Sequence, residues 1–160
     1  MNTFRNAFLL AALLMAGAAP TWAQADTAPT LGMGKAAALA YLKEQDVYAV
    51  PSNLIRHAMD LDVDIVTAFM AAGIDPNDPS LAPNTPLSMA TVYACSASKG
   101  AWDRQIKTID VLLQAGADVN YVNSAGLGIL MMAAQQCPAV VTKRLLQAGA
   151  KLEQRNPQGY

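Results

Sequence analysis

The feature that most constrains the fold is an internal repeat in the second half of the chain. Residues 109–120 (IDVLLQAGADVN) align with residues 142–153 (TKRLLQAGAKLE) at an offset of 33 positions. A related segment at 65–77 places Phe69 43 positions before Leu112, which is one period plus an insertion. A fixed period of this length is typical of stacked repeat proteins, in which one unit cannot bury its apolar face alone. We therefore predict a stack of similar units.

The repeated segments have the pattern of helices that end at glycine. Ile109, Leu112 and Leu113 are spaced i, i+3, i+4, which places them on one face of a helix. The glycines that follow, at 116 and 149, suit the left-handed residue that ends many helices. Upstream, Thr85 and Pro86 suit the N-cap and first position of another helix. Two helices per unit are therefore expected.

The motifs at 85–90 (TPLSMA) and 112–120 (LLQAGADVN) resemble those of ankyrin repeats. Ser88 stands where the family has His, and the third copy, at 128–133 (GILMMA), lacks the Thr-Pro pair. The resemblance covers about 51–160 and is to ankyrin-repeat proteins of an exported bacterial type. It implies an all-α fold, an ankyrin-repeat solenoid of helix–turn–helix repeats with projecting loops.

The predicted organisation follows from this resemblance. Residues 26–34, which contain Pro, Thr and Gly, are expected to form a flexible tail, and residues 35–50 an N-terminal capping helix. The repeats are placed at 51–83 for repeat 1, at 84–122 for repeat 2 with an inserted loop at about 95–104, and at 123–155 for repeat 3. Residues 156–160 would begin an incomplete fourth repeat.

The C-terminal repeat is expected to have an open edge. Without a further helix pair, it would leave four apolar side chains partly uncovered: Met131, Met132, Leu145 and Leu146. Exposed apolar patches of this kind mark interaction surfaces. Two explanations stand beside each other: the natural protein is longer, or this edge meets a partner or a second copy of the chain.

The first 25 residues are predicted to be a cleaved signal peptide. Arg5 precedes an uncharged apolar run at 7–19, and the small residues of Ala23-Gln24-Ala25 suit signal peptidase, with cleavage between Ala25 and Asp26. A membrane-spanning helix is the alternative, but the run is shorter than the roughly 20 residues that a bilayer requires. We expect an exported protein with no membrane association after signal removal. The periplasm is the favoured compartment, and secretion is the alternative.

Composition excludes several classes of function. The formal net charge is −1, and the basic residues are scattered, which argues against a nucleic-acid partner. His57 is the single histidine and is expected to be a partly buried packing residue, because no nucleophile-elbow or catalytic-triad pattern surrounds it. Two cysteines and one distant histidine do not make a tetrahedral metal site. We therefore expect no metal, no cofactor and no enzymatic activity.

Cys95 and Cys137 are the two cysteines of the chain. Aligning Ala90 with Ala133 places both near the ends of neighbouring first helices. In an oxidising compartment an even number of cysteines favours pairing, so they are a candidate disulfide. The alternative is two reduced, buried thiols, because packed helix axes lie about 8–10 Å apart whereas bridged Cα atoms lie within about 7 Å.

The resemblance implies a protein-binding module whose loop tips and first helices contact the partner. The candidates in loops are Asp78, Pro79, Ser80, Asn84, Tyr121, Asn123, Ser124, Gln154 and Arg155. The candidates in the first helices and the inserted loop are Tyr93, Gln135, Gln136 and Trp102. Trp102 is a candidate interface anchor, and the alternative is that it packs against the lengthened helices of its own repeat.

The expected function is therefore recognition of another exported protein, of unknown identity, as an inhibitor, immunity factor or accessory factor. An alternative is a self-assembling structural unit that associates through the uncapped C-terminal repeat. A small exported enzyme that merely contains repeats is the third hypothesis, and it lacks a catalytic constellation to support it.

Overall fold

A computed structural model of the protein describes residues 28–96 and 99–153. The signal-peptide residues 1–25, the loop candidates Gln154 and Arg155, and residues 156–160 lie outside the described residues. Within the described ranges the chain forms seven α-helices and no strand, apart from an isolated bridge between Val122 and Gly128. No helix in this part of the chain is long and apolar enough to cross a membrane. The predicted all-helical fold is therefore confirmed for these residues.

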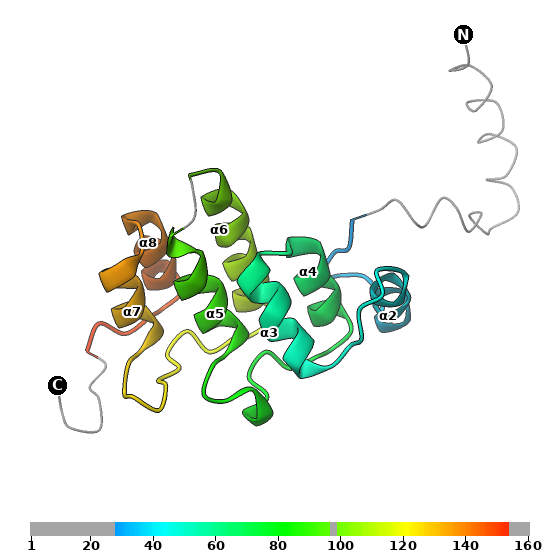
Figure 1. Ribbon diagram of the computed structural model, residues 1–160, viewed down its shortest axis with the longest axis horizontal. Helices are drawn as coiled ribbons and strands as arrows, with labels where there is room; N and C mark the ends of the chain where they lie inside the picture. The colour runs from blue at the N-terminus through cyan, green and yellow to red at the C-terminus, as the bar shows by residue number, and fades with distance from the viewer. Residues whose placement is uncertain (1–27, 97–98, 154–160) are drawn as a thin grey trace, which may run out of the picture.

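The helices form a repeat-like stack of pairs (Figure 1). Their bounds are α2 (Lys35–Glu44), α3 (Pro51–Asp60), α4 (Val63–Ala71), α5 (Pro86–Val92), α6 (Lys99–Gln114), α7 (Ile129–Gln136) and α8 (Ala139–Gln147). Two short 3-10 turns, η2 (Pro79–Leu81) and η3 (Tyr93–Ser96), lie on either side of α5. In each pair, α3–α4, α5–α6 and α7–α8, the two helices pack against each other.

Neighbouring pairs contact one another in two layers of helices. Helix α5 packs against both α3 and α7, so these three form a continuous inner layer. In the outer layer α4 packs between α2 and α6, and an ion pair between Asp110 and Arg144 links α6 to α8. The long connections at 72–85 and 115–128 both extend from one side of the stack (Figure 1).

A continuous apolar core runs between the layers. Leu54, Phe69, Leu87, Ile129 and Leu145 are fully buried in it. Burial of a side chain of this size contributes about 1.5–3 kcal/mol relative to its exposure. These residues come from all three helix pairs, so the stack shares one core.

The expectation that the C-terminal pair leaves its apolar side chains uncovered is wrong for Leu145, which is fully buried between the last two helices. Met131 and Met132 are half-buried, and Met132 packs against the core. Leu146 is 40% exposed because it lies on the outward face of α8. Three of the four side chains are therefore partly exposed, as expected, and Leu145 alone is fully buried.

Helices α4, α6 and α8 end in the same way. Gly73, Gly116 and Gly149 follow them with φ of 80°, 88° and 89°, in the left-handed region that favours glycine. At the first of these ends, the N–H of Ile74 donates to the carbonyl of Phe69 at 3.1 Å, and the other two ends repeat this bond. This geometry satisfies carbonyl groups that the helix itself leaves unpaired. The repeated sequence thus gives a repeated backbone turn.

Helix α2 is shorter than the helix expected at 35–50. It ends at Glu44, Asp46 adopts a left-handed φ of 57°, and the N–H of Val47 donates to the carbonyl of Leu42 at 2.8 Å. This is the same type of end as at the three glycines, formed here without a glycine. The apolar residues at 47–50 belong to the connection that leads into α3.

The described part of the expected flexible tail is packed. Pro29 is buried, and Leu31 and Met33 are half-buried against the core. The N–H of Met33 also donates to the carbonyl of Thr30 at 3.0 Å, which closes a turn before α2. These side chains thus cover part of the core surface, and the flexibility of residues 26–34 stays a prediction.

The expected loop at about 95–104 is largely helical. η3 continues α5 as far as Ser96, and α6 begins at Lys99, so Trp102 lies in the first turns of a long helix. The insertion therefore lengthens the second helix of its pair.

Candidate functional site

Neighbouring loops are joined by the side chain of Asn77. Its Nδ2 donates to the carbonyl of Gly116 at 2.8 Å, and its Oδ1 accepts the N–H of Asp118 at 2.8 Å. A carboxamide can donate and accept at once, whereas a carboxylate only accepts. Asn77 therefore fixes the loop after α4 to the end of α6.

Asn120 repeats this arrangement one unit later. Its Nδ2 donates to the carbonyl of Gly149 at 3.4 Å, and its Oδ1 accepts the N–H of Lys151 at 2.9 Å. We call these two rungs, formed by Asn77 and Asn120, the loop ladder. Sequence reasoning did not identify it, although asparagine occurs four residues after the helix-ending glycine in both copies.

Two of the predicted loop residues are occupied by contacts within the protein. The Tyr121 hydroxyl donates to the carbonyl of Pro83 at 3.0 Å, so it joins neighbouring loops. Asn123 is half-buried, and its Oδ1 accepts the N–H groups of Ala125 and Leu127, each at 3.0 Å. Both side chains therefore hold the loops in shape.

Asp78 also has a local role. Its Oδ1 accepts the N–H of Ser80 at 2.8 Å, which caps the turn η2. Hydrogen bonds from the side chain and then the backbone of Ser80 hold the pKa of the Asp78 carboxyl below its ordinary value. The carboxylate is therefore ionised and fixed in direction at the loop tip.

The remaining described loop candidates are exposed: Pro79, Ser80, Asn84 and Ser124. They lie at the side of the stack from which the long connections extend (Figure 1). Tyr93, which is 59% exposed, and the exposed Gln135 and Gln136 lie at the opposite ends of α5 and α7. Since these helices are about 10–12 Å long, the predicted residues form two groups, one at each end of the inner layer.

Trp102 is half-buried on α6. Its indole Nε1 is inaccessible to solvent and has no hydrogen-bond partner within the described ranges. The side chain is therefore partly withdrawn from solvent, and its role as an interface anchor stays a prediction.

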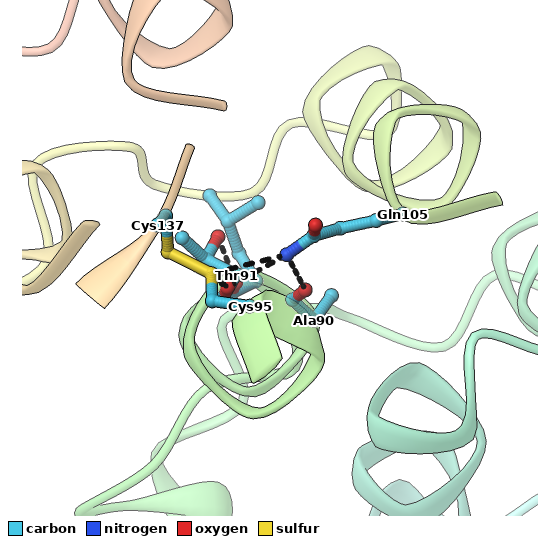
Figure 2. Close-up of a disulfide and its surroundings, with 6 residues drawn as sticks. Ala90, Thr91, Cys95, Gln105 and Cys137 are labelled. Carbon is cyan, nitrogen blue, oxygen red and sulfur yellow. Dashed lines mark hydrogen bonds between the residues drawn. A yellow bond between two sulfur atoms is a disulfide. The ribbon is translucent and has the colours of Figure 1, made fainter. Parts of the chain in front are cut away.

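A disulfide joins Cys95 and Cys137, whose Cα atoms lie 4.8 Å apart (Figure 2). This is closer than packed helix axes allow. Cys95 lies in the tight turn η3, and Cys137 has extended backbone just after α7. Because neither cysteine lies within an α-helix, the distance between their Cα atoms is not fixed by the distance between packed helix axes. The bridge thus connects the ends of two neighbouring inner helices.

Gln105 completes this junction from the outer layer. It is fully buried, and its Nε2 donates to the carbonyls of Ala90 at 3.1 Å and Thr91 at 2.8 Å (Figure 2). Carbonyl groups near the end of a helix lack partners within it, so the side chain from α6 stabilises the end of α5. Figure 2 shows the disulfide on the other side of Thr91.

His57 links the first helix pair. It is buried, and its Nδ1 lies 2.8 Å from Oδ2 of Asp62, the residue that precedes α4. This agrees with a packing role, which its position between α3 and α4 explains. In the part of the chain that the structure describes, no group of three His, Cys, Asp or Glu side chains could hold a metal ion.

Fold and site together define an all-helical, repeat-like protein with a cysteine pair at disulfide distance. No protein-family model matches the chain, and no curated protein is significantly similar to it.

Proposed function

We propose that this chain is an exported ankyrin-repeat module that binds another protein and acts as its inhibitor, immunity factor or accessory factor. The proposal is supported by the repeat motifs in the sequence and by three stacked helix pairs with connections on one side. Functional residues are disproportionately found on loops that a rigid scaffold positions.

The observation that carries the proposal is the contrast between fixed and exposed loop residues. Asn77, Asn120 and Asn123 hold the loops by hydrogen bonds within the protein. Pro79, Ser80, Asn84 and Ser124 are exposed on those same loops. A loop that is already ordered loses less conformational entropy on binding, so such a surface is suited to recognition.

The test begins with affinity capture from a periplasmic extract, with the mature chain from Asp26 as bait. A stoichiometric partner is expected, and its affinity is then measured by calorimetry for a set of variants. Replacing Asn84 and Ser124 together by Arg should weaken binding, because the larger charged side chains obstruct the loop surface. The control places the same substitutions at Gln45 and Gln147, which are exposed and lie outside the candidate set.

A second pair of variants tests the other end of the inner layer. Tyr93→Ala removes an aromatic side chain that is 59% exposed, and Tyr48→Ala is its matched control at a side chain that is 76% exposed. Weaker binding for Tyr93→Ala alone assigns the partner to the helix ends. If no specific partner is captured, or if all variants bind as the parent does, the proposed binding surface is wrong.

Export is tested separately. The full chain, expressed in a bacterial host, is fractionated, and the mass of the protein in the periplasmic and external fractions is measured. A mature chain that begins at Asp26 is expected. A full-length protein that remains in the cytoplasm contradicts this part of the proposal.

A further inference from the structure

The loop ladder identifies a chemical group that joins one loop to the next. In both rungs a carboxamide donates to the carbonyl of the helix-ending glycine and accepts the N–H two residues later. The receiving pairs are Gly116 with Asp118, and Gly149 with Lys151. Any other position with the same backbone geometry presents the same acceptor and donor.

The end of α4 presents this pair a third time. Gly73 has φ of 80°, close to the values at Gly116 and Gly149, and Asp75 stands two residues after it. Both residues are exposed, and within the described ranges neither the Gly73 carbonyl nor the Asp75 N–H has a hydrogen-bond partner.

The preceding unit supplies no carboxamide at the corresponding position. After helix α2, Asp46 forms the same type of turn that Gly73 forms after α4, and four residues later the chain has Val50. An isopropyl side chain neither donates nor accepts a hydrogen bond. We call the pair formed by the Gly73 carbonyl and the Asp75 N–H the open rung.

A hollow of about 350 Å³ adjoins the open rung. Its walls come from the N-terminal segment and from the ends of α4 and α6, and its apolar residues are Leu31, Met70, Ile74, Pro76 and Ala115. The open rung thus lies beside a hollow that combines polar and apolar surface in similar proportion, which suits an occupant with one hydrogen-bonding group and one apolar neighbour.

We propose that the open rung and its hollow bind an asparagine or glutamine side chain of the partner protein, flanked by an apolar residue. The carboxamide donates to the Gly73 carbonyl and accepts the Asp75 N–H, and the apolar neighbour packs against Leu31 and Ile74. A carboxylate fits poorly, since it cannot donate to the carbonyl and is repelled by the Asp75 side chain. The identity of the occupant as a protein segment rests on the proposed function.

The experiment uses the ¹⁵N-labelled mature chain and two peptides that differ in one group. The peptide acetyl-Leu-Asn-Leu-N,N-dimethylamide, whose C-terminus has no N–H, is expected to shift the Asp75 amide resonance in a saturable way, in the millimolar range. The peptide acetyl-Leu-Asp-Leu-N,N-dimethylamide should bind about fivefold more weakly, as expected for the loss of one well-formed hydrogen bond.

A matched pair of variants tests the hollow. Leu31→Ser removes a wall residue on the N-terminal segment, outside the helix pairs, and should weaken binding of the asparagine peptide. Leu39→Ser makes the same change at a side chain that is 38% exposed on α2 and does not line the hollow, so affinity should stay unchanged. Chemical shift dispersion of both variants verifies that they are folded.

Several outcomes overturn the proposal: equal affinity for the two peptides, shifts that cluster away from Gly73 and Asp75, or no saturable shift. A further outcome concerns hydrogen exchange of the Asp75 amide without peptide. If this amide is protected in the mature chain but not in a chain that starts at Ala28, the protein's own N-terminus fills the rung, and the proposal is wrong. Failure of partner capture with specific peptide binding contradicts the proposed function alone. A captured partner without peptide binding contradicts this inference alone.

Discussion

At the scale of single residues, asparagine has the role that most directly connects one repeat-like unit with the next. Asn77 and Asn120 each bridge a carbonyl and an N–H of the following unit. Side-chain bonds to loop backbone of this kind satisfy polar groups that the helix ends leave unpaired. The ladder therefore orders the loops that carry the candidate binding residues.

Replacing Asn77 should lower the free energy of unfolding. Asn77→Ala removes both bonds to the following unit, and Asn77→Asp keeps the acceptor but sets a carboxylate oxygen against the Gly116 carbonyl, so both variants should be less stable than the parent. A loss of about 1–3 kcal/mol is expected for the alanine variant from urea unfolding followed by circular dichroism. Asn84→Ala is the control, because that exposed side chain makes no hydrogen bond in the described structure. If all variants have the same free energy of unfolding as the parent, the loop ladder does not stabilise the fold.

The carboxyl of Asp78 should titrate below its ordinary pKa because Ser80 donates hydrogen bonds to it. Ser80→Ala removes the side-chain donor, so the pKa of Asp78 should move up toward the ordinary value. Since the folded-state pKa is the lower one, the contribution to stability is present above the unfolded pKa and is lost as pH falls through the folded one. Carboxyl NMR titration measures the shift. Ser124→Ala should leave it unchanged, and an unmoved pKa in Ser80→Ala contradicts the assignment.

At the scale of secondary-structure elements, the junction of α5, α6 and α7 is held by covalent and hydrogen bonds together. The disulfide joins η3 to the end of α7, and Gln105 of α6 donates to the last carbonyls of α5. Tyr93, Gln135 and Gln136 lie next to this junction in the sequence. A stable junction therefore fixes the second group of candidate binding residues.

Removal of the disulfide should destabilise the fold substantially. The cysteines are 42 residues apart, and the loop-entropy relation gives about 4 kcal/mol for a bridge of this separation. Urea unfolding with and without reductant should show this loss for the parent. The double variant Cys95→Ala/Cys137→Ala should be insensitive to reductant. Two alkylated thiols under non-reducing conditions, detected by mass spectrometry, would show that the bridge does not form in the isolated protein.

Helix α2 should be the first element to open. It packs against α4 at one end of the stack, and only Ala38 and Leu42 among its residues are buried. α5 lies between α3 and α7 and buries most of its residues. Hydrogen exchange measured by mass spectrometry should therefore be faster in α2 than in α5. Similar protection in both would indicate that the stack opens as one unit.

The sequence predicted elements where a local signal was strong. The apolar spacing and terminal glycines located the ends of α6 and α8, and Thr85 with Pro86 located the start of α5. The end of α2 was missed because Asp46 adopts the left-handed conformation that usually belongs to glycine. The start of α6 was missed because the sequence at 95–104 has a loop-like composition that packing overrides.

The candidate site was less predictable than the fold. Exposure of Asn84 and Ser124 follows from their positions in loops, but the internal bonds of Tyr121 and Asn123 depend on the path of neighbouring loops. Gln105 donates a hydrogen bond to the carbonyl of Thr91, 14 positions earlier in the chain, and no local sequence pattern indicates that the two groups meet. Such contacts depend on the stack as a whole.

At the scale of the whole molecule, we expect a monomer, and the reason lies at the C-terminal end of the described residues. The large apolar side chains exposed near the C-terminal end are Val140, Leu146 and Leu152. Glu153 stands at the position that asparagine holds in the ladder, and a carboxylate has no donor for a next rung. A copy stacked on this end would therefore lack the bond that joins the units inside one chain.

Light scattering of the mature chain should give a monomer mass at all concentrations that remain soluble. A mass that rises with concentration, and returns to that of the monomer in Leu146→Lys/Leu152→Lys, would support self-assembly through this end. Gln45→Lys/Gln147→Lys controls for the added charge at exposed positions.

The position of the disulfide has a mechanical consequence. Cys95 precedes α6 and Cys137 follows α7, so the bridge encloses α6, the loop at 115–128 and α7. When the chain is pulled from its two ends, the force passes through the disulfide and not through the 42-residue span that it encloses. That span contributes about 140 Å to the fully extended length only after the disulfide is reduced. The redox state of the cysteines therefore determines the maximum extension of this protein under force.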